Sequence, residues 1–179
     1  MSLPFADASF DLTLCQHGLQ FFPDRAGATR EMHRVLKRNG RASVIVLQEL
    51  AKHPVFEAVI KSISSHFSLP VSAFAIPFAL SSAEELKSLF LSAGFERVEV
   101  IAETTTVQFS DAGRFVPVAV MSSAAAVPAF AQLGAADRGS LLQSVIAEVD
   151  STLQQYRDGE AIVFPMYAHV AVAIKDKEI

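Results

Sequence analysis

The stretch FDLTLCQ (residues 10–16) and the stretch ASVIVL (residues 42–47) decide the fold class. Both contain residues that favour strands, and the second is almost entirely apolar, as is typical of a strand buried on both faces of a parallel sheet. A helical pattern separates the two stretches. Strand, helix and strand in this order predict a βαβ unit, and with it an α/β fold.

The helix of this unit is predicted over residues 24–38. Asp24 can cap its start, and apolar residues recur at helical spacing behind it. Lys37 and Arg38 suit the negative end of the helix dipole, and Asn39-Gly40 is a typical stop because both residues tolerate a left-handed backbone.

The rest of the chain continues the alternation of helices and strands. Apolar residues four apart, the capping box SAEE (residues 82–85) and a long amphipathic pattern each indicate a helix. Helices are predicted over residues 54–67, 82–94 and 142–156, and strands near residues 10–16, 42–48, 96–108 and 161–174.

The uncharged run over residues 115–136 is long enough to cross a bilayer in principle. Pro117 and Pro128 would interrupt such a helix, and the polar residues and alanines in the run lower its transfer energy. Two short buried or lid-forming helices are therefore predicted in place of a membrane span.

Composition restricts the function classes. The chain has 179 residues, of which 51% are hydrophobic and 19% charged, so it can bury a single core. The net charge is −4 and the 15 Lys and Arg residues are scattered, which argues against nucleic-acid binding. One cysteine cannot form an internal disulfide, and the first residues lack the pattern of a secretory signal, so we expect a cytoplasmic protein.

Several segments of the sequence, taken together in their order and spacing along the chain, resemble those of a known protein family. They are LPFADASFD (residues 3–11), CQHGLQFFPD (15–24) and REMHRVLKRNGR (30–41), followed later by SSAEEL (81–86) and AGF (93–95). Together they resemble small-molecule class I S-adenosylmethionine-dependent methyltransferases of the ubiquinone-biosynthesis type. One small departure is Arg38-Asn39-Gly40, where the family usually has Pro-Gly-Gly.

The resemblance implies an incomplete Rossmann-like methyltransferase fold. We expect the C-terminal half of the family's sheet, of mixed direction and with an antiparallel pair of strands at one edge, plus lid helices. Residues 1–179 would form a single truncated domain, with a helical lid inserted over residues 110–158.

The family binds S-adenosylmethionine chiefly through segments upstream of the Leu-Pro-Phe motif, above all a glycine-rich loop. None of the eight glycines of this chain belongs to a Gly-x-Gly pattern, which lets a backbone approach such a cofactor closely. The resemblance therefore implies cofactor use by the complete family members, and we expect this fragment to bind none by itself and to be inactive.

The residues at the end of the first strand are the candidate site. Ligands of open α/β sheets lie beyond the carboxyl ends of the strands, so Cys15, Gln16, His17 and Gly18 would face the methionine end of the cofactor. His17 is also the candidate general base, because imidazole titrates near neutral pH. The alternatives are structural: a small buried thiol for Cys15, loop hydrogen bonds for Gln16, and room for a turn at Gly18.

Aromatic residues could line a pocket for a small, lipophilic acceptor, although such residues are more often plain core. The candidates for this substrate lid are Phe21, Phe22, Phe74, Phe78 and Phe115. The histidines are widely spaced, with no cysteine or carboxylate cluster in ligand register, so no metal site is predicted.

Two functions from different classes remain open. The first is the C-terminal portion of a methyltransferase, and the alternative is a non-catalytic dimerisation or scaffold remnant of that fold. In either case the first strand would lie at a newly exposed sheet edge, and such an edge can pair with a second copy. We therefore expect a homodimer.

Overall fold

The computed structural model describes residues 2–125 and 127–175. The chain divides into two compact units, which are described separately. The first contains the residues up to Glu49, Pro77–Glu103 and the residues from Tyr167 onward, and the second contains Leu50–Ile76 and Thr104–Met166.

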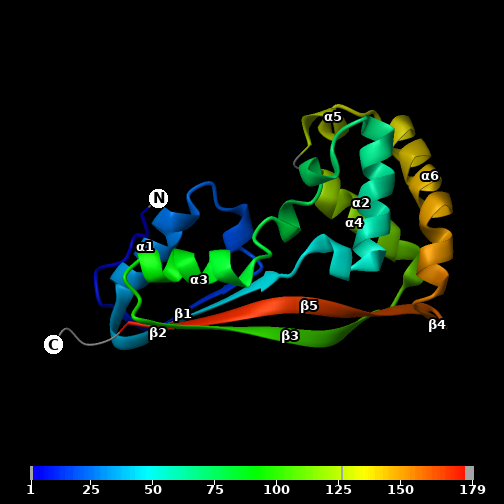
Figure 1. Ribbon diagram of the computed structural model, residues 1–179. Helices are drawn as coiled ribbons and strands as arrows, with labels where there is room; N and C mark the ends of the chain where they lie inside the picture. The colour runs from blue at the N-terminus through cyan, green and yellow to red at the C-terminus, as the bar shows by residue number, and fades with distance from the viewer. Residues whose placement is uncertain (1, 126, 176–179) are drawn as a thin grey trace. The chain divides into compact units, whose positions relative to one another are not determined.

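The strands of the described residues form one mixed sheet of five strands (Figure 1). The order is β1-β2-β5-β3, with β1 and β2 parallel, β2 and β5 antiparallel, and the short β4 paired with β5. The four predicted strands are confirmed, as are the neighbouring positions of the last two long strands at one edge. The strands are β1 (Phe10–Gln16), β2 (Leu36–Leu47), β3 (Arg97–Phe109), β4 (Arg157–Asp158) and β5 (Ala161–Ile174).

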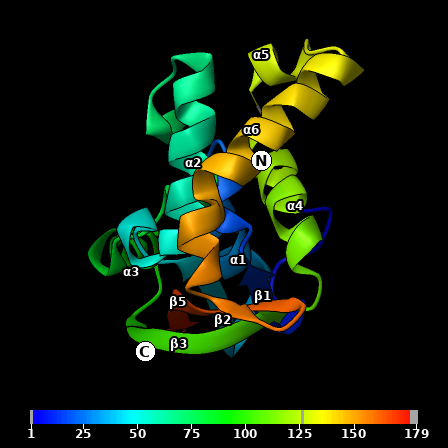
Figure 2. The same cartoon turned by 90° about the vertical axis from the view of Figure 1, so that its right-hand side faces the viewer.

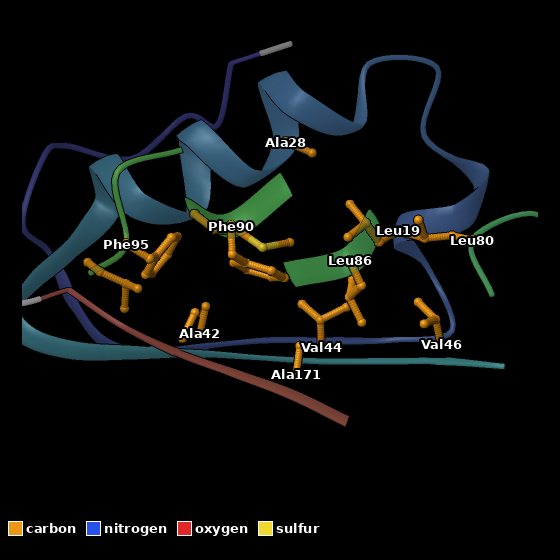
Figure 3. Packing of buried hydrophobic residues seen from close by; sticks show 13 residues of the cluster. Leu19, Ala28, Ala42, Val44, Val46, Leu80, Leu86, Phe90, Phe95 and Ala171 are labelled. Atoms are coloured by element: carbon orange, nitrogen blue, oxygen red, sulfur yellow. The ribbon is translucent and has the colours of Figure 1, made fainter. Parts of the chain in front are cut away.

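In the first unit, α1 (Arg25–Val35) and α3 (Ala83–Ser92) lie on the same side of the strands (Figure 1). Both helices begin at predicted caps, because the side chain of Asp24 accepts the N–H of Gly27 and that of Ser82 accepts the N–H of Glu85. Their apolar stripes cover alternate residues of β2 and β5 to form one core (Figure 3).

The core side of the sheet follows from the strand register. Cys15 lies opposite Val44, and Val44 lies opposite Ala171, so these side chains share one face, which packs against Leu86 and Phe90 of α3. Leu14 lies in the next row and points to the other face, where its side chain is 72% exposed.

The predicted end of the first helix is wrong. Helix α1 stops at Val35, and Leu36 already begins β2, so Lys37 and Arg38 lie in a strand. The ammonium group of Lys175, from the far end of the chain, donates to the carbonyls of His33 and Leu36 at 2.8 and 2.9 Å. Asn39 has φ of 61°, the left-handed backbone expected of it, and its N–H bonds to the carbonyl of Lys175.

The second unit is built from helices, the part of β3 from Thr104 onward and the part of β5 up to Met166. Its helices are α2 (Pro54–Phe67), α4 (Ala112–Ala124), α5 (Pro128–Ala131) and α6 (Ala135–Gln154), and α2 lies beside both α4 and α6 (Figure 2). Helix α2 is as predicted, whereas α6 begins about two turns before residue 142. Leu141 is buried on the same stripe as Val145 and Val149, which extends the packed face toward the helix start.

The uncharged run is divided between helices, as predicted: α4 begins just before it, at Ala112, and α5 lies within it. Pro117 does not end α4. Pro117 lies in the second turn of α4, where its missing N–H gives up only the bond to the carbonyl of Gly113. None of the helices in the described residues has the length and apolar character that crossing a membrane requires.

Glu148 of α6 joins two side chains of α2 within the second unit. It accepts the hydroxyl proton of Ser62 at 2.6 Å and lies 2.9 Å from Nε2 of His66. The hydrogen bond from Ser62 holds the pKa of Glu148 below its usual range. A carboxylate whose pKa is lowered by folding stabilises the fold above its unfolded pKa, and this contribution is lost as the pH falls through the lowered folded value.

We therefore expect Glu148→Gln to lower the melting temperature at pH 7 and to reduce the loss of stability between pH 5 and pH 3. The amide cannot titrate and pairs less well with both partners. Thermal unfolding followed by circular dichroism at several pH values measures both effects. Glu103→Gln, at an exposed position of β3, is the control. Equal pH dependence in the two variants would contradict the role of Glu148.

Candidate functional site

The carboxyl ends of β1 and β2 lie side by side because the two strands are parallel. Gln16 lies opposite Ile45, and the N–H of His17 then donates to the carbonyl of Ile45 at 2.8 Å. The chain turns there into the short 3-10 helix η1 (Leu19–Phe21). The residues predicted from the strand end are therefore held at the sheet's carboxyl edge, where open α/β folds bind ligands.

His17 has a backbone that its side chain disfavours. Its φ is 49°, in the left-handed region, and such strain is common at functional sites. The ring is half-buried, and Nδ1 is buried without a hydrogen-bond partner. Burial lowers the pKa of His17, so the imidazole is neutral at pH 7 and can accept a proton. This state suits the predicted general base, which stays a prediction.

Cys15 and Gly18 form a tight turn. The thiol sulfur of Cys15 accepts the backbone N–H groups of Gly18 and Leu19, and burial raises its pKa, so it remains a thiol at neutral pH. A Cβ at Gly18 would lie only 2.9 Å from that sulfur. Cys15 and Gly18 thus shape the strand end together. The side chain of Gln16 is exposed, on the face opposite to Cys15.

One buried residue at this end was not predicted. Gln20, within η1, is 3% exposed, and neither its amide nitrogen nor its amide oxygen has a hydrogen-bond partner. His169 of β5, which lies opposite Val46 of β2, also has a buried Nδ1 without a partner. Gln20 is the lone amide in the run LQFF, and that isolation is the signal in the sequence that could have singled it out.

The five predicted lid residues are divided between the two units. Phe22 packs against the core of the first unit, and Phe21 is exposed. Phe78 is buried in that unit. Phe74 and Phe115 belong to the second unit, where Phe74 contacts Phe67 and Phe115 contacts Phe164. Their role in acceptor binding stays a prediction.

An apolar hollow of about 360 Å³ lies beside β1 in the first unit. Its wall includes Cys15 and Phe22, together with residues of α1 and of the N-terminal segment. Arg34 of α1 holds that segment in place. Its guanidinium donates to the carbonyls of Leu3 and Phe5, and to the carboxylate of Asp7 at 2.6 Å.

Glu31, also on α1, completes this contact. Its carboxylate accepts from Arg34 at 2.8 Å and from the N–H of Leu3 at 2.7 Å. The hydrogen bond from Arg34 lowers the pKa of Glu31 to about 2. Across residues 2–125 and 127–175, no three His, Cys, Asp or Glu side chains come together as metal ligands.

Gly18→Ala is expected to lower the free energy of unfolding by about 1–3 kcal/mol, because the added methyl group overpacks the contact with Cys15. Cys15→Ala removes the sulfur, so the double variant should lose less than the sum of the two single variants. Urea unfolding of the four proteins measures the coupling. Strictly additive losses would contradict this contact.

The sequence matches known proteins over part of its length. Residues 1–44 match the methyltransferase domain family. A ubiquinone/menaquinone biosynthesis C-methyltransferase from Geotalea uraniireducens is 31% identical over 112 residues, which cover 55% of this chain and 46% of that protein. A demethylmenaquinone methyltransferase from Alkalihalophilus pseudofirmus is 34% identical over 115 residues, covering 56% and 47%. The chain therefore spans about half the length of these relatives.

The fold agrees with these matches. A candidate methyltransferase from Bacillus halodurans C-125, known from its crystal structure, aligns with 98% of this chain and 74% of its own, with a TM-score of 0.55 and 16% identity. At that identity the likeness concerns the fold alone. Over the matched part of its sequence the chain is thus similar to methyltransferases, and its fold resembles their Rossmann-like α/β architecture.

Proposed function

We propose that this chain is the C-terminal portion of an S-adenosylmethionine-dependent methyltransferase that acts on a small, lipophilic acceptor. The observation that carries the proposal is the match of residues 1–44 to the methyltransferase domain, because this stretch contains β1, α1 and the turn with His17. The names of the relatives, which belong to ubiquinone and menaquinone biosynthesis, support an acceptor of the quinone type.

In this proposal the residues at the strand end serve the reaction centre. The cofactor, when bound, supplies the methyl group, and Cys15, Gln16, His17 and Gly18 lie at its methionine end. His17 accepts the proton of the acceptor, since its imidazole is neutral at pH 7 and Nδ1 is free to bond. Residues 110–158, which contain α4, α5 and α6, form the lid over the acceptor.

The proposal includes inactivity of the fragment by itself. The turn after β1 can contact one end of a cofactor, but the sequence holds no Gly-x-Gly loop for the close backbone approach that the family's cofactor needs. We therefore expect S-adenosylmethionine and its demethylated product to bind this chain weakly or not at all. Isothermal titration calorimetry measures this, and one site per chain with a micromolar Kd would contradict it.

The second candidate is a non-catalytic dimerisation or scaffold module, and the exposure of β1 favours it. Among residues 2–125 and 127–175, β1 is an edge strand, and Leu12 and Leu14 on its outer face are 50% and 72% exposed. The backbone groups of such an edge can pair with another strand. Calorimetry on the chain extended at its N-terminus by a glycine-rich methyltransferase segment separates the candidates, because only the first predicts that cofactor binding is then gained.

Both candidates include a homodimer held through β1. Light scattering after size exclusion should give a mass of about twice 19.3 kDa at micromolar concentration. Leu14→Lys should shift the equilibrium toward the monomer, because the charge would enter the paired edge. Leu91→Lys, on the exposed side of α3, is the control and should leave the mass unchanged. A stable monomer of the unaltered chain would contradict the dimer.

A further inference from the structure

Two glutamines at the carboxyl end of the sheet are equally buried but differ in their hydrogen bonds. Gln20 and Gln48 are each 3% exposed. The amide nitrogen of Gln48 donates to the carbonyl of Ala168 at 2.9 Å, whereas both amide atoms of Gln20 are without a partner. A buried polar atom without a partner destabilises a fold, so the unpaired amide of Gln20 needs a reason.

The position of Gln20 is fixed by its backbone. Nη2 of Arg25 donates to the carbonyl of Gln20 at 3.0 Å, and the η1 turn is closed by bonds from Phe21 to Gly18 and from Phe22 to Leu19. Leu19 is fully buried in the core of the first unit, beside Leu80 (Figure 3). The amide of Gln20 is therefore held inside the protein by its neighbours on both sides.

Other unpaired polar atoms belong to the same end of the sheet. His17, whose Nδ1 is unpaired, directly follows β1. His169, whose Nδ1 is also unpaired, lies opposite Val46, the last core valine of β2. Ligands of open α/β folds bind beyond this end. Unpaired buried groups at this end are typical of a site that completes its hydrogen bonds with a ligand.

We infer that Gln20 is a specificity-determining residue. Its amide binds a planar group of the methyl-accepting substrate, in which a hydrogen-bond donor and a hydrogen-bond acceptor lie side by side. An amide offers one N–H donor and one carbonyl acceptor in one plane, so its best partner has the complementary pair, as in a carboxamide or a hydroxyl next to a carbonyl. The inference deepens the proposed function by naming the chemistry of the methyl acceptor. A site built to bond such a group rejects analogues that lack it, because its own polar atoms are then left unpaired.

The first test compares the two glutamines by thermal unfolding of the whole chain. Gln48→Met removes a satisfied hydrogen bond and should lower the melting temperature by about 2–4 °C. Gln20→Met removes only unpaired atoms, so it should leave the melting temperature unchanged or raise it. An equal fall in both variants would overturn the inference, because Gln20 would then be an ordinary structural amide.

The second test uses benzamide as a probe of the complementary group and acetophenone, which has the same ring and a carbonyl but no donor, as its control. The side-chain Nε2–H signals in a 15N-correlated NMR spectrum are assigned by their loss in Gln20→Met and in Gln48→Met. Benzamide should shift the signal of Gln20 but not that of Gln48, and acetophenone, which offers no donor to the carbonyl of Gln20, should shift the Gln20 signal less. A Gln20 signal that benzamide leaves in place, or that both probes shift alike, would overturn the inference.

Neither test uses the cofactor or methyl transfer, so the two proposals fail separately. If the chain completed with a glycine-rich segment transferred no methyl group, the thermal and NMR results for Gln20 would still stand. If the completed chain were active and Gln20→Met left the acceptor KM unchanged, the methyltransferase proposal would stand and the role of Gln20 would fall.

Discussion

The first unit depends on the register between β1 and β2. Thr13 lies opposite Ala42 and Cys15 opposite Val44, which turns these side chains toward α1 and α3 and turns Leu12 and Leu14 away from them. A slip of one residue would exchange the two faces, turning Leu12 and Leu14 toward the helices and Thr13 and Cys15 away from them. The same register brings the N–H of His17 to the carbonyl of Ile45, so the core and the candidate site rest on one set of backbone bonds.

Most strands and helices could be predicted from the sequence because their signals are local. β1 and β5 have the predicted bounds, and the caps at Asp24 and Ser82 are in place. The end of α1 could not be predicted, because it is decided by Lys175, 139 residues beyond Leu36 along the chain. That ammonium group accounts for the carbonyls of His33 and Leu36 at the end of the helix. The residues that follow form β2, in which Arg41 pairs with Ile174 at the end of β5.

The candidate site was only partly visible in the sequence. A strand that ends in Cys15-Gln16-His17-Gly18 indicates where a ligand lies, but the outward side chain of Gln16 and the bonds between Cys15 and the turn are consequences of geometry. Gln20 differs from these residues. The run LQFF marks it only as an isolated amide, and its unpaired burial, set beside the hydrogen-bonded amide of Gln48, separates it from a structural glutamine.

The strand that carries the candidate site is also the open edge of the sheet, so the two features are physically linked. In the part of the chain that the structure describes, β1 pairs with β2 on one side alone, and its outer apolar residues are exposed. A strand that paired along its free edge would restrain the backbone up to Gln16, directly before the strained φ of His17. A partner at the edge would thus reach the candidate site through the seven residues of one strand.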